Sequence, residues 1–294
     1  MARPRVLVTG AGGQLGRAAM ALAGTGLELV GLDRAALDIT SPASVAAAFD
    51  RVNPGLVVNL AAYTAVDRAE DEQAAAFAVN RDGVANLARA CRAHGAAMIH
   101  VSTDYVFDGA KKAAWREDDP IAPLSVYGRS KAEGEAALRA ALPHHAILRT
   151  SWVFGARGAN FVRTVLGRIG KAEELRVVDD QHGSPTAAAD LARAIAVVAR
   201  GLSADPALSG TYHYCNAGVT SWFGFAQAIF ARAAERGLKP PRLVPIKAAG
   251  YAAKAKRPAN SALDCARIEA AFAVARPPWR ESLIPVVDAI LDER

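Results

Sequence analysis

The chain contains 294 residues, 52% of them hydrophobic, which predicts one large or two modest globular domains and excludes a disordered chain. Its net charge of +6 arises from 35 basic and 29 acidic residues. Because the basic residues are scattered rather than clustered, we expect small anionic ligands such as nucleotides and no nucleic-acid binding.

The sequence shows no segment that would span or cross a membrane. No run approaches the ~18 uninterrupted apolar residues of a transmembrane helix. The opening MARPRVLVTG places basic residues before an apolar run of only about four residues, which predicts a strand rather than a signal peptide, so we expect a cytoplasmic protein. Cys91, Cys215 and Cys265 form no C-x-x-C pair, which favours buried free thiols over disulfides or a zinc site.

The first half of the chain alternates short apolar runs with alanine-rich helical patterns. Strands are predicted at 5–10, 27–33, 56–62, 97–103 and 146–152, and helices at 14–24, 41–51, 72–95 and 130–142. Such alternation is typical of parallel strands joined by crossover helices. Since the strands are almost continuously apolar, the sheet should be covered on both faces. The predicted fold class is therefore α/β, with a doubly wound parallel sheet.

This alternation changes after residue 150. The patterns there predict a helix over 160–170, a strand followed by a loop over 175–181, a helix over 185–200 that Pro185 opens, and an amphipathic helix near 221–236. We therefore divide the chain into a first domain over 1–150, with a returning part near 172–200, and a smaller mixed α/β C-terminal domain over 151–171 and 201–294 that would bind the substrate.

Three glycines lie where the first predicted strand meets the first helix, in VTGAGGQLG. Gly10, Gly13 and Gly16 have the spacing G-x-x-G-x-x-G, with Gln14 and Leu15 inside the turn. Residues without a Cβ permit a tight turn and let a pyrophosphate approach backbone N–H groups at a helix N-terminus. Glycine-rich turns are common in βα units, but this one, at the first strand–helix junction, predicts a dinucleotide site.

The second predicted strand ends at Asp33, seventeen residues after Gly16. An acidic side chain there can accept hydrogen bonds from ribose hydroxyls and repel a 2′-phosphate, which favours NADH. Arg34 can instead pair with a 2′-phosphate, which favours NADPH. In an alternative interpretation Asp33 is a helix N-cap or a surface residue. The sequence leaves the choice between the two cofactors open, and Asp38 and Ile39 are predicted to border the adenine.

The third predicted strand ends in NLAAYTAVD. Small side chains at Ala61 and Ala62 would let the cofactor lie close to the backbone. Ala62, Tyr63 and Thr64 are therefore predicted to bind the cofactor, and Tyr127 and Lys131, described next, belong to the same set.

Tyr127 and Lys131, in YGRSK, are the candidate catalytic pair, because a helix places residues four apart on one face. A neighbouring ammonium stabilises a phenolate and lowers the pKa of tyrosine from its usual value near 10, which suits a general acid. A Tyr-x-x-x-Lys pattern alone also occurs by chance on surface helices. The fourth strand, however, ends in Ser102-Thr103 in the same crevice as the glycine turn, where a hydroxyl can bind a substrate oxygen beside Tyr127.

These motifs together resemble the signature of the extended short-chain dehydrogenase/reductase superfamily, whose first domain is a dinucleotide-binding (Rossmann) domain. Within it, the chain is similar to the dTDP-4-dehydrorhamnose reductase family over nearly its whole length. Seven phrases in order carry this similarity and are far more specific than the superfamily motifs: AAYTAVDRAE (61–70), STDYVFDG (102–109), LRTSWVFG (148–155), NFVRTVL (160–166), VVDDQHGSPTAAADLA (177–192), GTYHYCNAG (210–218) and RPANSALD (257–264).

The resemblance implies reduction of the C4 keto group of dTDP-4-dehydro-L-rhamnose by hydride transfer from NADPH, with NADH as the alternative. It implies that Thr103 and Tyr127 bind the keto oxygen, that Tyr127 donates the proton, and that Lys131 tunes Tyr127 and holds the nicotinamide ribose. Asp104 would orient the sugar. Related sugar-nucleotide dehydratases carry Asp-Glu after the threonine, whereas Tyr105 follows Asp104 here, so dehydration is disfavoured.

The resemblance also implies substrate contacts from the second half of the chain. Trp152 matches a tryptophan that packs against the substrate, although a core aromatic is the alternative. Gln181, Ser184 and Arg257 are predicted to line the sugar-nucleotide cleft, with the guanidinium on phosphate oxygens. The alternative for Arg257 is a solvated basic loop, KAKRP, and His182 is interpreted as a hydrogen-bonded loop histidine.

Some relatives dimerise through magnesium held by glutamates, one of which lies just after the glycine turn. Arg17 and Ala18 occupy that place here. The predicted helix over 185–200 offers Asp190, but no glutamate that matches those of the relatives. A cation site would not favour Arg17. We therefore predict no metal site, with magnesium not expected, and either a monomer or a metal-independent homodimer.

Two other functions share these features. The regulatory subunit of methionine adenosyltransferase resembles the same family, but a purely binding role would tolerate loss of Tyr127 or Lys131, and both are present. A sugar-nucleotide epimerase shares this pair but releases no oxidised cofactor. The sequence leaves open the base of the nucleotide sugar and the choice among neighbouring 4-keto-6-deoxy sugars.

Overall fold

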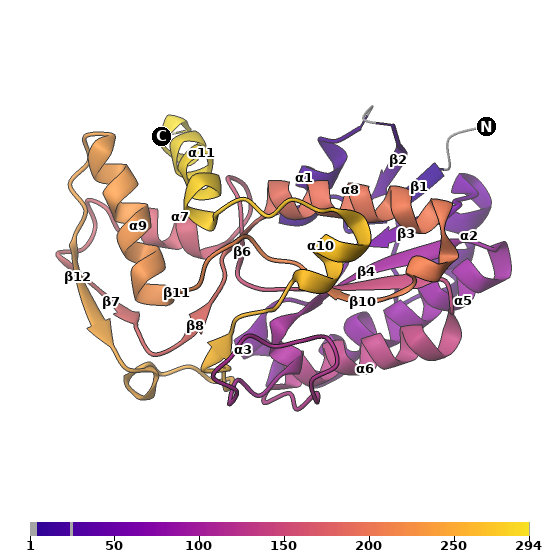
Figure 1. Cartoon of the computed structure of the whole chain (residues 1–294), viewed down its shortest axis with the longest axis horizontal. Helices are drawn as coiled ribbons and strands as arrows, with labels where there is room; N and C mark the ends of the chain where they lie inside the picture. Colours follow the sequence, from indigo (N-terminus) through magenta and orange to yellow (C-terminus); the bar gives the residue numbers. More distant parts are fainter. Residues whose placement is uncertain (1–4, 24–25, 294) are drawn as a thin grey trace.

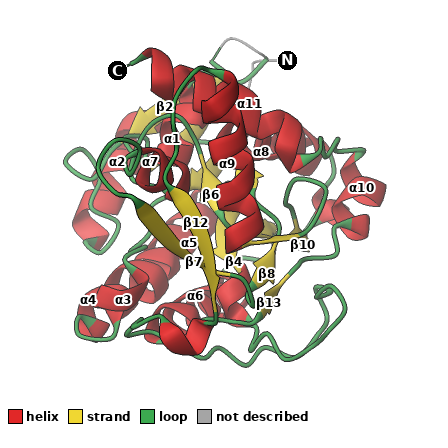
Figure 2. Ribbon diagram, turned by 90° about the vertical axis from the view of Figure 1, so that its left-hand side faces the viewer, coloured by secondary structure: helices red, strands yellow, loops and turns green. Residues whose placement is uncertain are grey.

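The computed structural model describes residues 5–23 and 26–293, and within them a parallel sheet of six strands forms the centre (Figures 1 and 2). The strand order is β10-β5-β4-β3-β1-β2, and every neighbouring pair is parallel. The chain reverses direction across the sheet between β1 and β3, which is where doubly wound folds bind ligands. The strands are β1 (Arg5–Thr9), β2 (Glu28–Leu32), β3 (Leu56–Asn59), β4 (Ala97–Thr103), β5 (His145–Thr150) and β10 (Gly210–His213).

Helices cover both faces of this sheet (Figure 1). One face carries α1 (Gln14–Met20) and α8 (Ala188–Ala204); the other carries α2 (Pro42–Val52), α5 (Val84–His94) and α6 (Val126–Ala141). Within β1, Val6 and Val8 pack in the core with α8, whereas Leu7 between them packs in the core with α2 and α5. This two-residue period confirms that both faces are buried, as the apolar strands predict.

The predicted helix over 72–95 is divided into three segments. These are α4 (Gln73–Phe77), a π-helical segment η1 (Ala78–Gly83) and α5, preceded by the short α3 (Val66–Ala69). The wide turn of η1 carries Asn80, whose side chain accepts a hydrogen bond from the Tyr63 N–H at 2.9 Å and donates to the Tyr63 carbonyl at 3.0 Å. A π-helical bulge here therefore fixes the segment that follows β3.

A second layer of structure lies beside the sheet, on the left of Figure 1. There α7 (Phe161–Leu166), α9 (Trp222–Glu235) and α11 (Trp279–Asp292) share a separate core with β7 (Glu174–Val178) and β12 (Arg242–Ile246). The shorter elements are η2 (Asp104–Val106), β6 (Val153–Phe154), β8 (His182–Gly183), β9 (Thr186–Ala187), η3 (Pro206–Leu208), β11 (Thr220–Ser221), η4 (Ala248–Gly250), β13 (Asn260–Ser261) and α10 (Ala266–Phe272).

Several predicted boundaries differ from the observed ones. The first helix ends at Met20 rather than at residue 24, which lies outside the described residues. The helix predicted to open at Pro185 begins at Ala188, because residues 186–187 form β9 and pair with β6. The strand predicted over 146–152 ends at Thr150, since Trp152 has a positive φ of 49°. None of the described helices combines the length and apolarity needed to cross a membrane.

The division into two domains remains a prediction. Strand β10, from the segment assigned to the C-terminal domain, pairs with β5 in the main sheet. Strand β7, from the returning part, pairs instead with β12 beside the second core. These pairings favour a boundary that assigns β10 to the first domain and β7 to the second.

Candidate active site

Two adjoining cavities of about 430 and 460 Å³ lie around the glycine turn, and Gly13, Leu60 and Ala62 line both. The first, which we call the adenosine cavity, is completed by Gly10, Gly12, Asp33, Arg34, Ala35, Leu37, Asp38, Ile39, Ala61, Tyr63 and Val79. The second, the reaction cavity, is completed by Gln14, Leu15, Gly16, Thr64, Val66, Val101, Ser102, Thr103, Asp104, Tyr105, Tyr127, Lys131, Thr150, Trp152, Val153, Ala159 and Trp222.

The glycine turn leaves no room for side chains at two of its positions. A Cβ on Gly16 would lie 2.2 Å from the Gly10 carbonyl oxygen, and a Cβ on Gly10 would lie 2.8 Å from the Ala61 nitrogen. Gly10 also has a φ of 64°, which favours glycine. The turn at Gly10 therefore packs closely against the segment after β3 on one side and against helix α1 on the other, which leaves backbone exposed where the two cavities meet. Such a cradle fits the pyrophosphate of a dinucleotide.

Asp33 caps the turn that follows β2. Its Oδ1 accepts hydrogen bonds from the N–H groups of Ala35 and Ala36, both at 3.0 Å. Arg34 is exposed, lines the same cavity, and has no ion pair among the described residues. The alternative interpretation of Asp33 as a cap thus matches the geometry, and the positive charge of the neighbouring Arg34 contributes to the lowered pKa of Asp38 in the same cavity.

Asp38 and Tyr63 are both fixed at the border of the adenosine cavity. Asp38 Oδ1 accepts hydrogen bonds from the Thr40 hydroxyl at 2.8 Å and the Thr40 N–H at 3.0 Å, which lower the pKa of its carboxyl. The Tyr63 hydroxyl donates to Glu72 Oε2 at 2.6 Å, and that bond raises the pKa of Tyr63. Both side chains are therefore held by neighbours close in sequence.

Helix α6 brings Tyr127 and Lys131 to the floor of the reaction cavity. Ser125 begins the helix as its N-cap, accepting a hydrogen bond from the Gly128 N–H at 3.1 Å. A Cβ on Gly128 would lie 2.3 Å from the Tyr105 carbonyl oxygen, so α6 packs closely against η2. The Tyr105 and Tyr127 rings meet edge to face at 5.5 Å. This packing places Tyr127 beside the end of β4.

Burial dominates the electrostatics of this pair. It raises the pKa of Tyr127 to about 12, opposed by a hydrogen bond with Thr103, and it lowers the pKa of Lys131 to about 8, opposed by Glu135. The expected lowering of the tyrosine pKa by the lysine is not observed. Lys131 Nζ instead donates to the Val101 carbonyl at 2.7 Å and lies 3.2 Å from His100 Nε2.

Thr103 and Asp104 lie at the carboxyl end of β4. The Thr103 hydroxyl donates to Asp104 Oδ1 at 3.0 Å and accepts a hydrogen bond from the Tyr105 N–H at 3.2 Å. Burial raises the pKa of Asp104 to about 6, although the hydroxyls of Ser261 and Thr103 offset part of that effect. Within the described residues, Asp104 Oδ2 has no partner in hydrogen-bond geometry, and it is therefore available to a ligand hydroxyl.

Trp152 closes the outer wall of the reaction cavity together with a second tryptophan. Its ring stacks on Trp222 with the centroids 3.6 Å apart and the planes at 10°. A Cβ on Gly183 would lie 2.7 Å from the Trp152 ring, so the ring is held from two sides. Trp222 was not predicted from the sequence, because it begins an amphipathic helix 70 residues away and carries no motif of its own.

Gln181 and Arg257 do not line either cavity. The Arg257 guanidinium pairs with both carboxylate oxygens of Asp67, at 3.1 and 2.7 Å, and the Ala255 N–H donates to the same carboxylate. Gln181 lies immediately before β8, whose Gly183 supports Trp152. Their roles as substrate contacts remain predictions. The His182 N–H donates to the Ala259 carbonyl at 2.8 Å, which joins these two segments.

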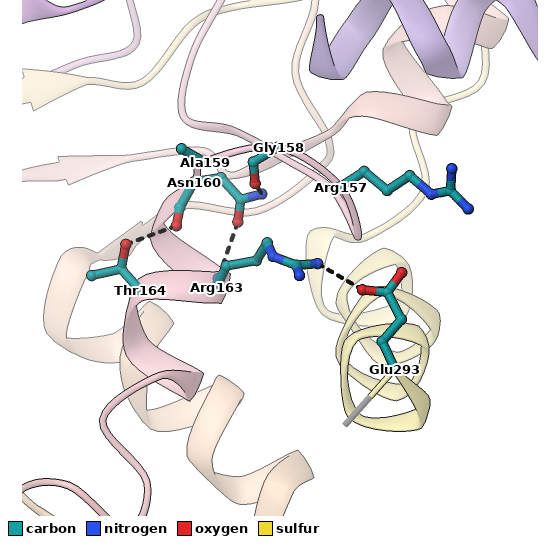
Figure 3. A pocket seen from close by; sticks show the side chains of 7 residues that line it. All are labelled: Arg157, Gly158, Ala159, Asn160, Arg163, Thr164 and Glu293. Atoms are coloured by element: carbon teal, nitrogen blue, oxygen red, sulfur yellow. Dashed lines mark hydrogen bonds and ion pairs between the residues drawn. The ribbon is translucent and has the colours of Figure 1, made fainter.

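A further cavity lies outside the cleft, between the loop after β6, helix α7 and the end of α11 (Figure 3). Figure 3 shows Arg163 reaching toward Glu293, at 3.1 Å, while Asn160 caps α7 by accepting from the Arg163 N–H. Asn160 Nδ2 also donates to Gln14 Oε1 at 2.8 Å. This region therefore supports the wall of the reaction cavity from outside.

Arg17 and Asp190, the two residues considered for a magnesium site in the sequence, are engaged in other interactions. Arg17 Nε donates to the Gly12 carbonyl at 2.9 Å. Asp190 accepts hydrogen bonds from Asn216 at 2.7 Å and Ser282 at 2.5 Å, and it also pairs with Arg193. Among residues 5–23 and 26–293, no three His, Cys, Asp or Glu side chains gather as metal ligands. The absence of a metal site stays a prediction.

The regions of this chain that match known proteins include all the residues that line the two cavities. The family model described as RmlD substrate binding domain matches residues 4–291. A dTDP-4-dehydrorhamnose reductase from Sinorhizobium fredii is 44% identical over 291 residues, 98% of each chain. A probable dTDP-4,6-dihydroxy-2-methyloxan-3-one 4-ketoreductase from Streptomyces antibioticus is 40% identical over 95% of this chain and 93% of that protein. A crystal structure of dTDP-4-dehydrorhamnose reductase from Bacillus anthracis in complex with NADP matches 100% of both chains, with a TM-score of 0.90 and 35% identity.

Proposed function

The chain belongs to the RmlD substrate binding domain family, and on that premise we propose that it reduces dTDP-4-dehydro-L-rhamnose to dTDP-L-rhamnose with NADPH, the final step of dTDP-rhamnose biosynthesis. The single observation that carries this proposal is the reaction cavity, where Thr103, Tyr127 and Lys131 line one wall beside the glycine turn. A hydroxyl, a phenol and an amine converge there next to a site whose shape fits a dinucleotide.

Each of the three side chains has a role that its surroundings support. The bound cofactor supplies a hydride for C4 of the sugar. The Tyr127 hydroxyl, whose high pKa keeps it protonated at neutral pH, donates its proton to the keto oxygen as negative charge develops there. The Thr103 hydroxyl holds that oxygen in place, and Lys131 orients the cofactor from the same helix face as Tyr127.

Asp104, Trp152, Gln181 and Arg257 are proposed to bind the sugar nucleotide. The unpartnered oxygen of Asp104 suits a sugar hydroxyl, and the stacked pair of Trp152 and Trp222 lines the cavity with apolar ring surface. Arg257 would have to leave Asp67 to reach a diphosphate, because both of its terminal nitrogens bind that carboxylate. These four assignments are the part of the proposal that depends on contacts made only with substrate present.

We propose NADPH as the preferred cofactor. The Asp33 carboxylate is occupied by two N–H groups of its own turn, and the exposed Arg34 lines the adenosine cavity without an ion pair among the described residues. A free guanidinium at this place matches a 2′-phosphate in charge and geometry. The cofactor-binding set is completed by Gly10, Gly13, Gln14, Leu15, Gly16, Asp38, Ile39, Ala62, Tyr63 and Thr64, all of which line one of the two cavities.

The test is loss of the nicotinamide absorbance with dTDP-4-dehydro-L-rhamnose generated in situ, with NADPH and NADH side by side. Steady oxidation that depends on the sugar is expected, faster with NADPH, and Arg34→Ala should reduce the difference between the cofactors. An epimerase would interconvert sugars without net oxidation. No oxidation despite cofactor binding would contradict the reductase proposal and favour either another keto sugar or a purely binding role.

A further inference from the structure

Behind Lys131, a row of buried polar side chains runs across the sheet, away from the reaction cavity. Lys131 Nζ lies 3.2 Å from His100 Nε2, His100 Nδ1 lies 3.0 Å from Asn59 Nδ2, and the Thr9 hydroxyl donates to Asn59 Oδ1 at 2.6 Å. Asn59 pairs directly with His100 across β3 and β4, and with Thr9 across β3 and β1. All four residues are at most 2% exposed.

The partners of Asn59 determine how its amide is oriented. Asn59 Oδ1 accepts hydrogen bonds from the Thr9 hydroxyl and, at 3.2 Å, from the Ala61 N–H. The amide nitrogen therefore faces His100. Since an amide NH₂ group only donates, His100 Nδ1 must present a lone pair to it.

This orientation selects one tautomer of His100. Burial is the largest cause that holds the pKa of His100 well below its usual value, and it acts whether Lys131 is charged or not, so the imidazole is neutral. A neutral imidazole carries one proton, and with Nδ1 as the acceptor that proton is on Nε2. The Nε2–H group then points at Lys131 Nζ.

An ammonium group has three donors and no acceptor, whereas an uncharged amine has a lone pair. We propose that His100 is a positioning residue for the reduction, which as the Nε2–H tautomer donates a hydrogen bond to the uncharged amine of Lys131 and so favours that form. The Val101 carbonyl, 2.7 Å from Nζ, accepts a hydrogen bond from the ammonium or from the amine and so fixes the position of the nitrogen. This inference rests on the proposed function, because it concerns the protonation of a residue in that reaction.

Other charged and titratable groups also lie near Lys131, but each is either bound by another residue or lies elsewhere than His100. On the same helix, Glu135 favours the ammonium, but Arg149 from β5 binds both of its oxygens, at 2.9 and 2.7 Å. Tyr127 and Asp104 lie on the cavity side. His145 from β5 acts on His100, and burial holds its own pKa low. The fall in the pKa of Lys131 to about 8 agrees with a site that favours the amine.

The consequence is that Lys131 loses its proton close to physiological pH. After Tyr127 has given its proton to the substrate oxygen, a phenolate remains. A proton that leaves the Lys131 ammonium can restore the phenol as the N–H bond breaks and an O–H bond forms, and His100 then donates to the lone pair left on nitrogen. Solvent returns the proton to Lys131 after product release, which balances the cycle.

Asn59→Asp tests this inference, because a carboxylate accepts hydrogen bonds where the amide donated. His100 should change to the Nδ1–H tautomer, leaving an Nε2 lone pair for the Lys131 ammonium. Nitrogen NMR of histidine-labelled protein should show Nε2–H in the wild type and Nδ1–H in the variant. The basic limb of the pH–rate profile should move up by about one pH unit.

His100→Gln provides a second variant without a new charge. The side-chain oxygen of the glutamine can accept a hydrogen bond from the Lys131 ammonium, so the basic limb of the pH–rate profile should again move up. His145→Gln is the matched control: it replaces a buried histidine of the adjacent strand that hydrogen-bonds the Leu142 carbonyl, and it should leave the limb unchanged. An Nδ1–H signal in the wild type, or unshifted limbs in both variants, would overturn the inference. Since the NMR signal needs no turnover, an inactive protein with an Nε2–H signal would refute the proposed function alone.

Discussion

The two walls of the reaction cavity are built differently. On the sheet side, Thr103, Tyr127 and Lys131 come from a strand end and the helix that packs against it, and all three side chains are buried or line the floor. On the outer side, Trp152 lies in a turn with a positive φ, and it is held by Trp222 from a helix of the second core. Gln181 and Arg257, assigned to the same wall, lie away from it.

This difference follows from what fixes each position. The carboxyl ends of parallel strands meet at one edge, and residues four apart share a helix face, so local geometry places the sheet-side residues. The outer wall depends on contacts between distant segments, such as Arg257 with Asp67, 190 residues apart. We therefore expect substitutions on the sheet side to affect the chemical step, and those on the outer side to affect substrate binding.

The largest effect should come from Tyr127→Phe. Loss of the general acid should reduce kcat by about 10² to 10⁴ while the cofactor still binds, because the ring and its contact with Tyr105 are retained. Steady-state kinetics at saturating substrate and a fluorescence titration with NADPH measure the two quantities. Tyr105→Phe removes the hydroxyl of the neighbouring ring and should change kcat far less. Comparable losses in both variants would show that the cavity tolerates no change in packing, and Tyr127 would have no special role.

Asp104→Asn should reveal a stability cost on the sheet side. Burial raises the pKa of Asp104 from 3.8 to about 6 in the folded protein, so the native state binds more protons than the unfolded state between those values. The free energy of unfolding of the wild type should therefore fall as pH rises through this range, by on the order of 3 kcal/mol from this group. The variant lacks the titrating carboxyl and should be more stable than the wild type above pH 6, as denaturant titrations across pH would show.

Asp38→Asn is the control of opposite sign. Hydrogen bonds from Thr40 lower the pKa of Asp38, so its contribution to stability is present above the unfolded pKa and is lost as pH falls through the folded value. Its replacement should destabilise the protein at neutral pH. If Asp104→Asn also destabilised the protein at neutral pH, contacts within the fold would more than offset the free-energy cost of burying the Asp104 carboxylate. The inferred burial cost would then be wrong.

The sequence predicted the sheet-side residues because each belongs to a regular element. Four of the five N-terminal strands lie within about two residues of their predicted bounds, whereas β3 ends at Asn59 and not at residue 62, as predicted. Such differences are usual for strand ends. Every predicted cofactor residue lines one of the two cavities. The period of hydrophobic residues and the spacing of glycines are local properties of the sequence, and they were sufficient to predict which residues line the sheet side of the cleft.

Features set by long-range pairing were not predictable in the same way. Strand β10 joins the main sheet only because β5 offers its free edge, and the π-helical segment depends on how Asn80 meets the Tyr63 backbone. Trp222 reaches the cavity because α9 packs in the second core. The low pKa of Lys131 follows from burial, which no spacing of residues in the sequence reports.

On the outer wall, Trp222→Ala should weaken substrate binding more than it slows the chemistry. The stacked pair with Trp152 is worth about 0.5–1.5 kcal/mol beyond its buried area, so KM for the sugar nucleotide should rise by up to about tenfold. Trp222→Phe keeps an aromatic partner for Trp152 and should restore most of the affinity. A fall in kcat with KM unchanged would contradict the proposed difference between the two walls, because it would mean that the outer wall also contributes to the chemical step.

The smallest effect should separate the two interpretations of Arg257. Its ion pair with Asp67 is partly exposed, with side chains 20% and 46% accessible, so a double-mutant cycle of Arg257→Gln and Asp67→Asn should give a coupling of about 0.5–1 kcal/mol in unfolding free energy. If Arg257 also turns to the diphosphate, Arg257→Gln should raise KM, whereas Asp67→Asn, which releases the guanidinium, should leave KM unchanged or lower it. Equal increases in KM for both variants would mean that Arg257 only holds its loop against α3, and the outer wall would then bind the nucleotide through other residues.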